Sequence, residues 1–162
     1  MKSTHRVSVR ALVLKDNSVL LVRHAHQDRP PFWCFPGGLV EENEDLLVAV
    51  RRELVEETGI SVEPLSVVAV QEFRKEKLLE VIFLCNYMSG TVSLGSDPDN
   101  PGLPVLVDAR WVPVEILGSF QVHPAELIPH LLEYGAEIGV GRFFSVFDKH
   151  SMIRRNSTGE VL

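Results

Sequence analysis

The segment from Gly38 to Ile60 constrains the fold most, because it predicts a helix with an acidic face. At 100° per residue, Glu56 and Glu57 lie about 60° to one side of Glu53 and about 40° to the other, so the three carboxylates share one face. Like charges at this spacing repel one another, so a cation is expected nearby. Hard carboxylate oxygens without His or Cys favour Mg²⁺, with Mn²⁺ as the alternative.

The helix that carries these acids is expected to span residues 44–58. Asn43 is its predicted N-cap, and Gly59 suits the position after the last turn, where left-handed backbone is common. An apolar stripe beside the acidic face is expected to pack on the core. Its members are Leu47, Val50 and Leu54. The acids would then lie at the edge of a cleft.

Alternating apolar residues predict β-strands on both sides of this helix. The expected strands cover residues 6–14, 18–23, 65–73, 78–87 and 109–112. Residues 24–38 are rich in Pro and Gly and are expected to form a loop, anchored by Trp33 and Phe35. Residues 124–134 predict a second helix, in which Pro129 either bends the helix or shifts its start.

The length of 162 residues suits one domain, expected over residues 1–150 and followed by a polar tail at residues 151–162. Cys34 and Cys85 form no CxxC pair and are expected to be small buried side chains. The sequence supports neither a signal peptide nor a membrane helix, so a cytoplasmic protein without membrane contact is expected.

The formal net charge of −6 argues against a broad nucleic-acid surface, because neutralising many phosphates requires clustered Lys and Arg. A small anionic ligand is compatible with this charge, since a few local cations or one bound metal can hold it.

These positions together resemble the complete Nudix box. Its fixed positions are occupied by Gly38, Glu44 and the run Arg52-Glu53-Leu54-Val55-Glu56-Glu57-Thr58-Gly59-Ile60. Two segments outside the box also resemble the family, namely Trp33-Cys34-Phe35-Pro36-Gly37-Gly38 upstream and Arg110-Trp111-Val112 downstream. The resemblance implies an α/β fold, namely an α/β/α sandwich with a mixed central sheet. It also implies a metal-dependent hydrolase for the pyrophosphate bond of a nucleoside diphosphate linked to another moiety.

The resemblance assigns roles to residues of the box. Glu53, Glu56, Glu57 and the Gly37 carbonyl are implied metal ligands, and Glu53 or an acid from a later loop is implied to activate the attacking water. The implied support for the helix and its acids comes from Gly38, Glu44, Arg52 and Gly59.

Other candidates lie outside the box. Arg23, with His24 and His26 after it, is a candidate for contact with substrate phosphates, although cations at strand ends are more often solvated. Asp97 and Asp99 are candidates for the later acid and for substrate binding, and Asp108 is a third such acid. Turn-rich segments such as residues 96–104 use Asp for local capping as readily.

The expected substrate is a small nucleotide derivative, in the class of nucleotide sugars, ADP-ribose or nucleoside triphosphates. Second signatures of particular branches are absent: Pro98 is the first proline after Pro64, and Tyr87 is the first tyrosine after the box. Two alternatives stay open, an RNA-cap hydrolase and a non-catalytic nucleotide-binding regulatory module. A homodimer is left open as well.

Overall fold

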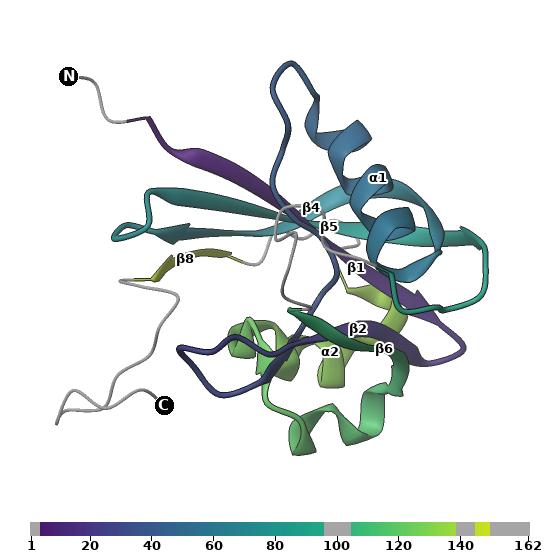
Figure 1. Ribbon diagram of the computed structural model, residues 1–162. Coiled ribbons are helices and arrows are strands. Elements are labelled where there is room, and N and C mark those ends of the chain that lie inside the picture. The colour runs from purple at the N-terminus through teal and green to yellow at the C-terminus, as the bar shows by residue number, and fades with distance from the viewer. Residues whose placement is uncertain (1–3, 96–104, 139–144, 150–162) are drawn as a thin grey trace, which may run out of the picture.

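The computed structural model describes residues 4–95, 105–138 and 145–149, which build one mixed sheet with helices around it (Figure 1). The strands are β1 (Arg6–Lys15), β2 (Ser18–His24), β3 (Phe32–Cys34), β4 (Ser61–Phe73), β5 (Leu78–Ser89), β6 (Leu106–Pro113), β7 (Val122–His123) and β8 (Ser145–Lys149). The α-helices are α1 (Leu46–Thr58) and α2 (Ile128–Tyr134), and the 3₁₀ helices are η1 (Val114–Ser119), η2 (Ala125–Leu127) and η3 (Gly135–Glu137).

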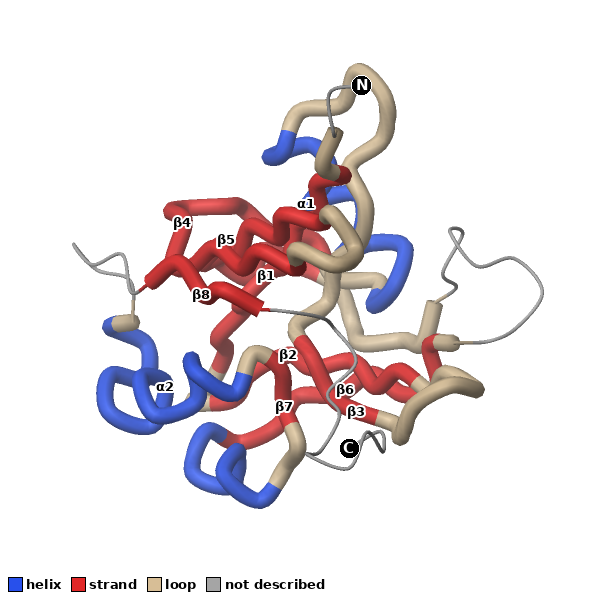
Figure 2. The backbone as a smooth tube through the Cα atoms, turned by 90° about the vertical axis from the view of Figure 1, so that its left-hand side faces the viewer, coloured by secondary structure: helices blue, strands red, loops and turns tan. Residues whose placement is uncertain are grey.

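The sheet has two halves that meet at β1. Strands follow the order β7-β3-β2-β1-β5-β4-β8, and β6 pairs with the other edge of β2. β1 pairs with β2 only beside their hairpin turn and then runs parallel to β5 over nine residue pairs, from Arg6 opposite Leu78 to Leu14 opposite Asn86. Figure 2 shows β1, β4, β5 and β8 in one half and β2, β3, β6 and β7 in the other. The parallel pairs β1/β5, β3/β7 and β4/β8 confirm the predicted mixed sheet.

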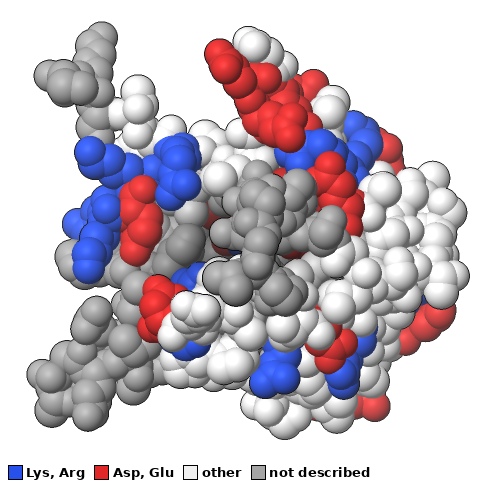
Figure 3. Space-filling model, in the orientation of Figure 1, with Lys and Arg blue, Asp and Glu red and all other residues white. Residues whose placement is uncertain are grey.

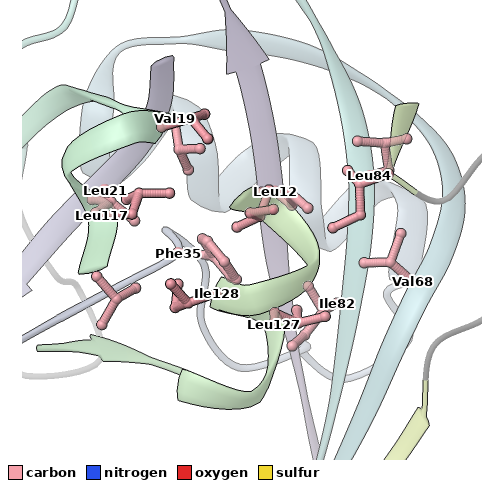
Figure 4. Close-up of a cluster of buried hydrophobic side chains, with 14 of the residues drawn as sticks. Leu12, Val19, Leu21, Phe35, Val68, Ile82, Leu84, Leu117, Leu127 and Ile128 are labelled. Carbon is pink, nitrogen blue, oxygen red and sulfur yellow. The ribbon is translucent and has the colours of Figure 1, made fainter. Parts of the chain in front are cut away.

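Helices cover both sides of the sheet because the strands bury apolar residues on both faces. On one side, Val9, Ala11 and Val13 of β1 pack with Val50 and Leu54 of α1. On the other side, a second core joins the sheet to η1, η2 and α2 (Figure 4). The residues labelled there are Leu12, Val19, Leu21, Phe35, Val68, Ile82, Leu84, Leu117, Leu127 and Ile128. This arrangement confirms the predicted α/β/α sandwich.

The start of α1 differs from the sequence prediction. Asp45, and not Asn43, is the N-cap, since its side chain accepts hydrogen bonds from the N–H groups of Leu47 and Val48, both at 2.9 Å. Asn43 instead has a φ of 65° and takes the left-handed turn before the helix, which Asn tolerates. Leu47 is 45% exposed, so its predicted place in the buried stripe is wrong, and Ala49 joins Val50 and Leu54 there.

Short strands lie where the sequence predicts none. β3 lies within the predicted loop at residues 24–38, and β7 precedes η2. Residues 124–134 do not form one helix, because a 3₁₀ turn comes first and α2 begins at Ile128, with Pro129 in its first turn. Pro129 therefore shifts the start of the helix, the second of the two predicted outcomes.

The predicted cysteine environment is confirmed. Cys34 and Cys85 are both buried and free, and burial raises the pKa of each thiol to about 12. No helix in the described part of the chain has the length and apolar character needed to cross a membrane. The predicted tail at residues 151–162 lies outside the described residues.

Candidate active site

The acidic face of α1 is set into the protein rather than left in water. Glu53 and Glu57 are 3% and 2% exposed, whereas the Glu56 side chain is 33% exposed. Burying carboxylates is costly unless each is paired or hydrogen-bonded. The groups around them therefore define the site.

Residues 35–39, here called the glycine turn, lie between β3 and α1 and directly against these acids. The Gly37 N–H donates to Glu57 Oε2 at 2.8 Å. Gly37 has a φ of 146°, and a side chain there would overlap the backbone carbonyl of Val9. A Cβ on Gly38 would lie 2.5 Å from Glu53 Oε1. Position 37 therefore requires glycine, and a side chain at Gly38 would displace the Glu53 carboxylate.

Arg52 donates hydrogen bonds to three carboxylates on the α1 side of this turn. It donates to both oxygens of Glu44 at 2.8 and 2.9 Å, to Glu53 Oε1 at 2.9 Å and to Glu56 Oε2 at 3.0 Å. Its Nη2 also donates to the Leu39 carbonyl at 3.0 Å. Hydrogen bonds from Arg52 lower the pKa of Glu44, and those to Glu44 in turn raise the pKa of Arg52. Arg52 thus orients the acids and the turn together.

Arg10 holds the turn from the sheet side, and sequence reasoning missed it. Its Nη1 donates to the Gly37 carbonyl at 2.8 Å and to the Phe35 carbonyl at 3.3 Å, while its Nε donates to Glu80 Oε2 at 2.9 Å. Glu80 also accepts bonds from Ser8 and Gln71. Burial works against the charge on Arg10, but the negative charges around it, with Glu80 first and Glu57 among the others, together outweigh burial and raise the pKa of Arg10.

Backbone N–H groups of the segment that follows β5 donate hydrogen bonds to the C-terminal end of α1. Gly59 has a φ of 70° and donates to the Val55 carbonyl, which confirms its predicted place after the last turn. The N–H groups of Ser93 and Gly95 donate to the carbonyls of Thr58 and Glu57 at 3.0 and 2.9 Å. These bonds fix the turn of the helix that carries Glu57.

Comparison with known proteins identifies the family of this chain. The family profile of the NUDIX domain matches residues 4–131. The chain belongs to the Nudix family. The mouse (Mus musculus) 8-oxo-dGDP phosphatase NUDT18 is 28% identical over 124 residues, covering 76% of this chain and 36% of that protein. An RNA pyrophosphohydrolase of Caulobacter vibrioides is 46% identical over 58 residues, covering 35% of this chain and 34% of that protein.

The fold of the Nudix chain is shared with solved structures. A crystal structure of an ADP-ribose pyrophosphatase from Streptococcus suis has a TM-score of 0.66 and 24% identity, covering 90% of this chain and 100% of that one. This likeness shows the fold alone. The Nudix chain spans 36% and 34% of the lengths of the mouse and Caulobacter relatives.

Among the predicted candidates outside the Nudix box, His24 lies beside an acid of the site. His24 Nε2 lies 3.9 Å from Glu57 Oε1, and its side chain is 9% exposed. Arg23 is exposed and, by strand alternation, lies on the opposite face of β2 from His24. Asp108 pairs with Arg110 and is opposite Arg23 across the β2/β6 ladder. The arrangement therefore favours His24 over Arg23 as a site residue.

Asp97 and Asp99 lie outside the described residues. Phe35 is fully buried in the core, which confirms it as an anchor, and Trp33 packs against the same core. Trp33 also contacts the Phe120 ring, at 5.7 Å between centroids.

The donor set fits a hard divalent cation by its chemistry. It offers carboxylate oxygens from Glu53, Glu56 and Glu57 on one helix face, and a Cβ-free approach at Gly38. Within residues 4–95, 105–138 and 145–149, no three His, Cys, Asp or Glu side chains form a ready-made cation cluster. Arg52 forms ion pairs with both Glu53 and Glu56. Its positive charge therefore already neutralises part of the negative charge that a bound cation would neutralise.

Proposed function

We propose that this protein is a hydrolase dependent on Mg²⁺ or Mn²⁺ that cleaves the pyrophosphate link of a nucleoside diphosphate joined to another group. The observation that carries the proposal is the Nudix box folded around two buried carboxylates, Glu53 and Glu57, with a third, Glu56, beside them. Arg52 supplies a single positive charge to Glu44, Glu53 and Glu56 together, so the acidic face stays short of positive charge, and this argues against a non-catalytic module.

In the proposed site, Glu53, Glu56, Glu57 and the Gly37 carbonyl would hold the cation. When bound, the cation neutralises phosphate oxygens and lowers the pKa of a bound water. Arg52 orients Glu53 and Glu56, and Arg10 and the Gly37 N–H fix the turn and Glu57.

Glu53, or a later acid such as Asp97, Asp99 or Asp108, would take a proton from the attacking water. The water oxygen bonds to phosphorus as the bridging P–O bond breaks, and the leaving phosphate carries away that electron pair.

The proposed substrate is a free nucleotide derivative, such as an oxidised nucleotide, ADP-ribose or a nucleotide sugar. Support comes from the 8-oxo-dGDP phosphatase relative and from the net charge of −6, which disfavours a long RNA groove. On the face drawn in Figure 3, acidic side chains lie among the Lys and Arg side chains rather than apart from them. A cytoplasmic location and a homodimer stay predictions.

The likeness to an RNA pyrophosphohydrolase makes RNA that carries a pyrophosphate link, capped RNA included, the second candidate substrate. That likeness covers 35% of this chain, so it ranks below the free nucleotides.

The decisive experiment measures phosphate and nucleotide release with Mg²⁺, with Mn²⁺ and with excess chelator. The panel includes 8-oxo-dGDP, ADP-ribose, nucleotide sugars, nucleoside triphosphates and triphosphorylated RNA. We expect cation-dependent release of nucleoside monophosphate from at least one free nucleotide derivative. Turnover that persists in excess chelator, or no release from any member, contradicts the proposal. Preference for the RNA supports the second candidate.

A further inference from the structure

His24 carries a buried nitrogen that no described residue satisfies. Its side chain is 9% exposed, and Nε2 has no hydrogen-bond partner in the described part of the chain. This atom lies 3.9 Å from Glu57 Oε1. The other oxygen of that carboxylate, Oε2, accepts the Gly37 N–H. Because buried polar atoms are nearly always hydrogen-bonded, the gap between His24 and Glu57 is expected to hold a partner.

The width of the gap indicates what kind of atom fits. A separation of 3.9 Å is too long for a direct hydrogen bond, which needs about 2.7–3.2 Å. An oxygen about 2.8 Å from both atoms would see them at an angle of about 90°, which a water tolerates. A Mg²⁺ ion at about 2.1 Å from both would need an angle of about 135°, whereas neighbouring ligands of an octahedral ion lie about 90° apart. The gap therefore fits an oxygen rather than a shared cation.

The chemistry of the two groups narrows the choice further. An ionised carboxylate only accepts hydrogen bonds, so the oxygen must carry a hydrogen toward Glu57. A phosphoryl oxygen carries none and would be repelled. A water meets the requirement, and it can either donate to or accept from a neutral imidazole.

The His24 ring is held in place by its neighbours. His24 lies opposite Phe32 in the β2/β3 ladder, and their rings are 5.6 Å apart with planes 13° from parallel. The His26 ring lies 5.8 Å from that of His24, with planes 9° from parallel. These contacts aim the buried nitrogen at the carboxylate and limit its movement away from it.

We propose that His24 Nε2 and Glu57 Oε1 bind one water molecule, through which His24 fixes the orientation of the Glu57 carboxylate. Glu57 would then be supported at both oxygens, at Oε2 by the Gly37 N–H and at Oε1 through this water. His24 is thus a positioning residue, and its catalytic consequence rests on the proposed function. Loss of such an outer hydrogen bond lowers metal affinity or activity by about 10–100-fold.

Two amide variants separate this role from a structural one. His24→Gln places an amide near the position of Nε2, whereas His24→Asn has a similar amide that is one methylene too short to reach the water. His5→Asn is the control for the substitution itself, because the His5 side chain is 41% exposed and pairs with Glu72 of β4 rather than with the acids of α1. The three variants are compared with the parent by kcat, by KM and by direct Mn²⁺ binding in calorimetry.

We expect His24→Asn to lower kcat or Mn²⁺ affinity by at least about tenfold, and His24→Gln to stay within about threefold of the parent. His5→Asn should also stay near the parent. Equal behaviour of the Gln and Asn variants at residue 24, or an equal loss in His5→Asn, overturns the positioning role.

A crystal structure of the parent that resolves ordered waters provides a readout independent of turnover. We expect a water within about 3.2 Å of both His24 Nε2 and Glu57 Oε1. A direct bond between the two residues, or a gap without density, overturns the inference. A parent that binds this water and Mn²⁺ but hydrolyses no nucleotide supports the water site and contradicts the proposed reaction.

Discussion

Arg52 and Arg10 both donate to carbonyl oxygens of the glycine turn, yet they do so from different surroundings. Arg52 lies on α1, and its acidic partners are on that helix or on the segment just before it. Arg10 lies on β1, and its partner Glu80 is seventy residues away on β5. One arginine is therefore part of a local motif, whereas the other depends on the pairing of two distant strands.

The two clusters also differ in how many acids surround the arginine, and this predicts different responses to mutation. The side chains of Arg10 and Glu80 are 18% and 7% exposed and form one pair, so removing one partner leaves a poorly solvated charge. Arg52 and its partner Glu53 are just as buried, at 20% and 4%, but the Glu56 side chain is 33% exposed, so water can replace part of what is lost at that acid. The sheet-side cluster should therefore govern stability, and the helix-side cluster should govern turnover.

The largest effect on stability is expected from Arg10→Met. The change removes the guanidinium and leaves Glu80 buried without its cation, so the free energy of unfolding should fall by about 3–5 kcal/mol. Urea unfolding followed by circular dichroism measures it. The double variant Arg10→Met/Glu80→Gln is the control and should recover more than half of the loss. A single variant within about 1 kcal/mol of the parent would show that the pair is not a stabilising contact.

Glu57→Gln is expected to give the largest effect on turnover. Gln keeps the shape of the side chain but removes a charge next to the Gly37 N–H, and we expect a loss of about 100-fold or more, equivalent to about 2.7 kcal/mol. Thermal melts should also show a smaller gain in melting temperature on adding Mg²⁺. Glu63→Gln, at an exposed acid paired with Arg51, is the matched control. Undiminished turnover with an unchanged Mg²⁺ response would defeat the assignment of Glu57.

Arg52→Lys tests the helix-side cluster with a smaller expected effect. An ammonium has three donors around one atom and cannot serve Glu44, Glu53 and the Leu39 carbonyl in the geometry of a guanidinium. We expect turnover to fall by about tenfold while stability changes by less than about 1.5 kcal/mol. Arg51→Lys, at the neighbouring position of the same helix, should match the parent. Equal effects of the two variants would show that charge alone suffices at residue 52.

The contrast between the clusters explains which parts of the site the sequence predicts. Glu53, Glu56, Glu57 and Arg52 repeat at helical spacing, so their shared face and the contact of Arg52 with Glu56 follow from local geometry. Arg10 follows a plain strand pattern, and nothing local shows that Ser8 and Arg10 will meet Glu80. That meeting requires the parallel β1/β5 pairing, in which Ser8 is opposite Glu80.

The same division holds for the fold. The long strands and α1 have strong periodicity and are confirmed, with shifts at their ends. β3 and β7 are short. They form because β3 pairs with β2 and β7 pairs in turn with β3, and no local pattern specifies either pairing. The N-cap was misplaced because both Asn43 and Asp45 are capping residue types, and only the left-handed backbone at Asn43 decides between them.

The smallest effect is expected from Glu44→Gln, and its dependence on pH identifies its cause. Hydrogen bonds from Arg52 lower the pKa of folded Glu44 below its unfolded value of about 4.3. The folded state then binds fewer protons, so this stabilisation is present above about pH 4.3 and is lost as the pH falls through the folded pKa. Glu44→Gln should therefore be less stable than the parent at pH 7, and the difference should shrink in acid. Urea unfolding at pH 7 and at about pH 3 measures it, with the exposed Glu42→Gln as control. A difference that stays constant with pH would mean that the shape of Glu44, rather than its charge, supports Arg52.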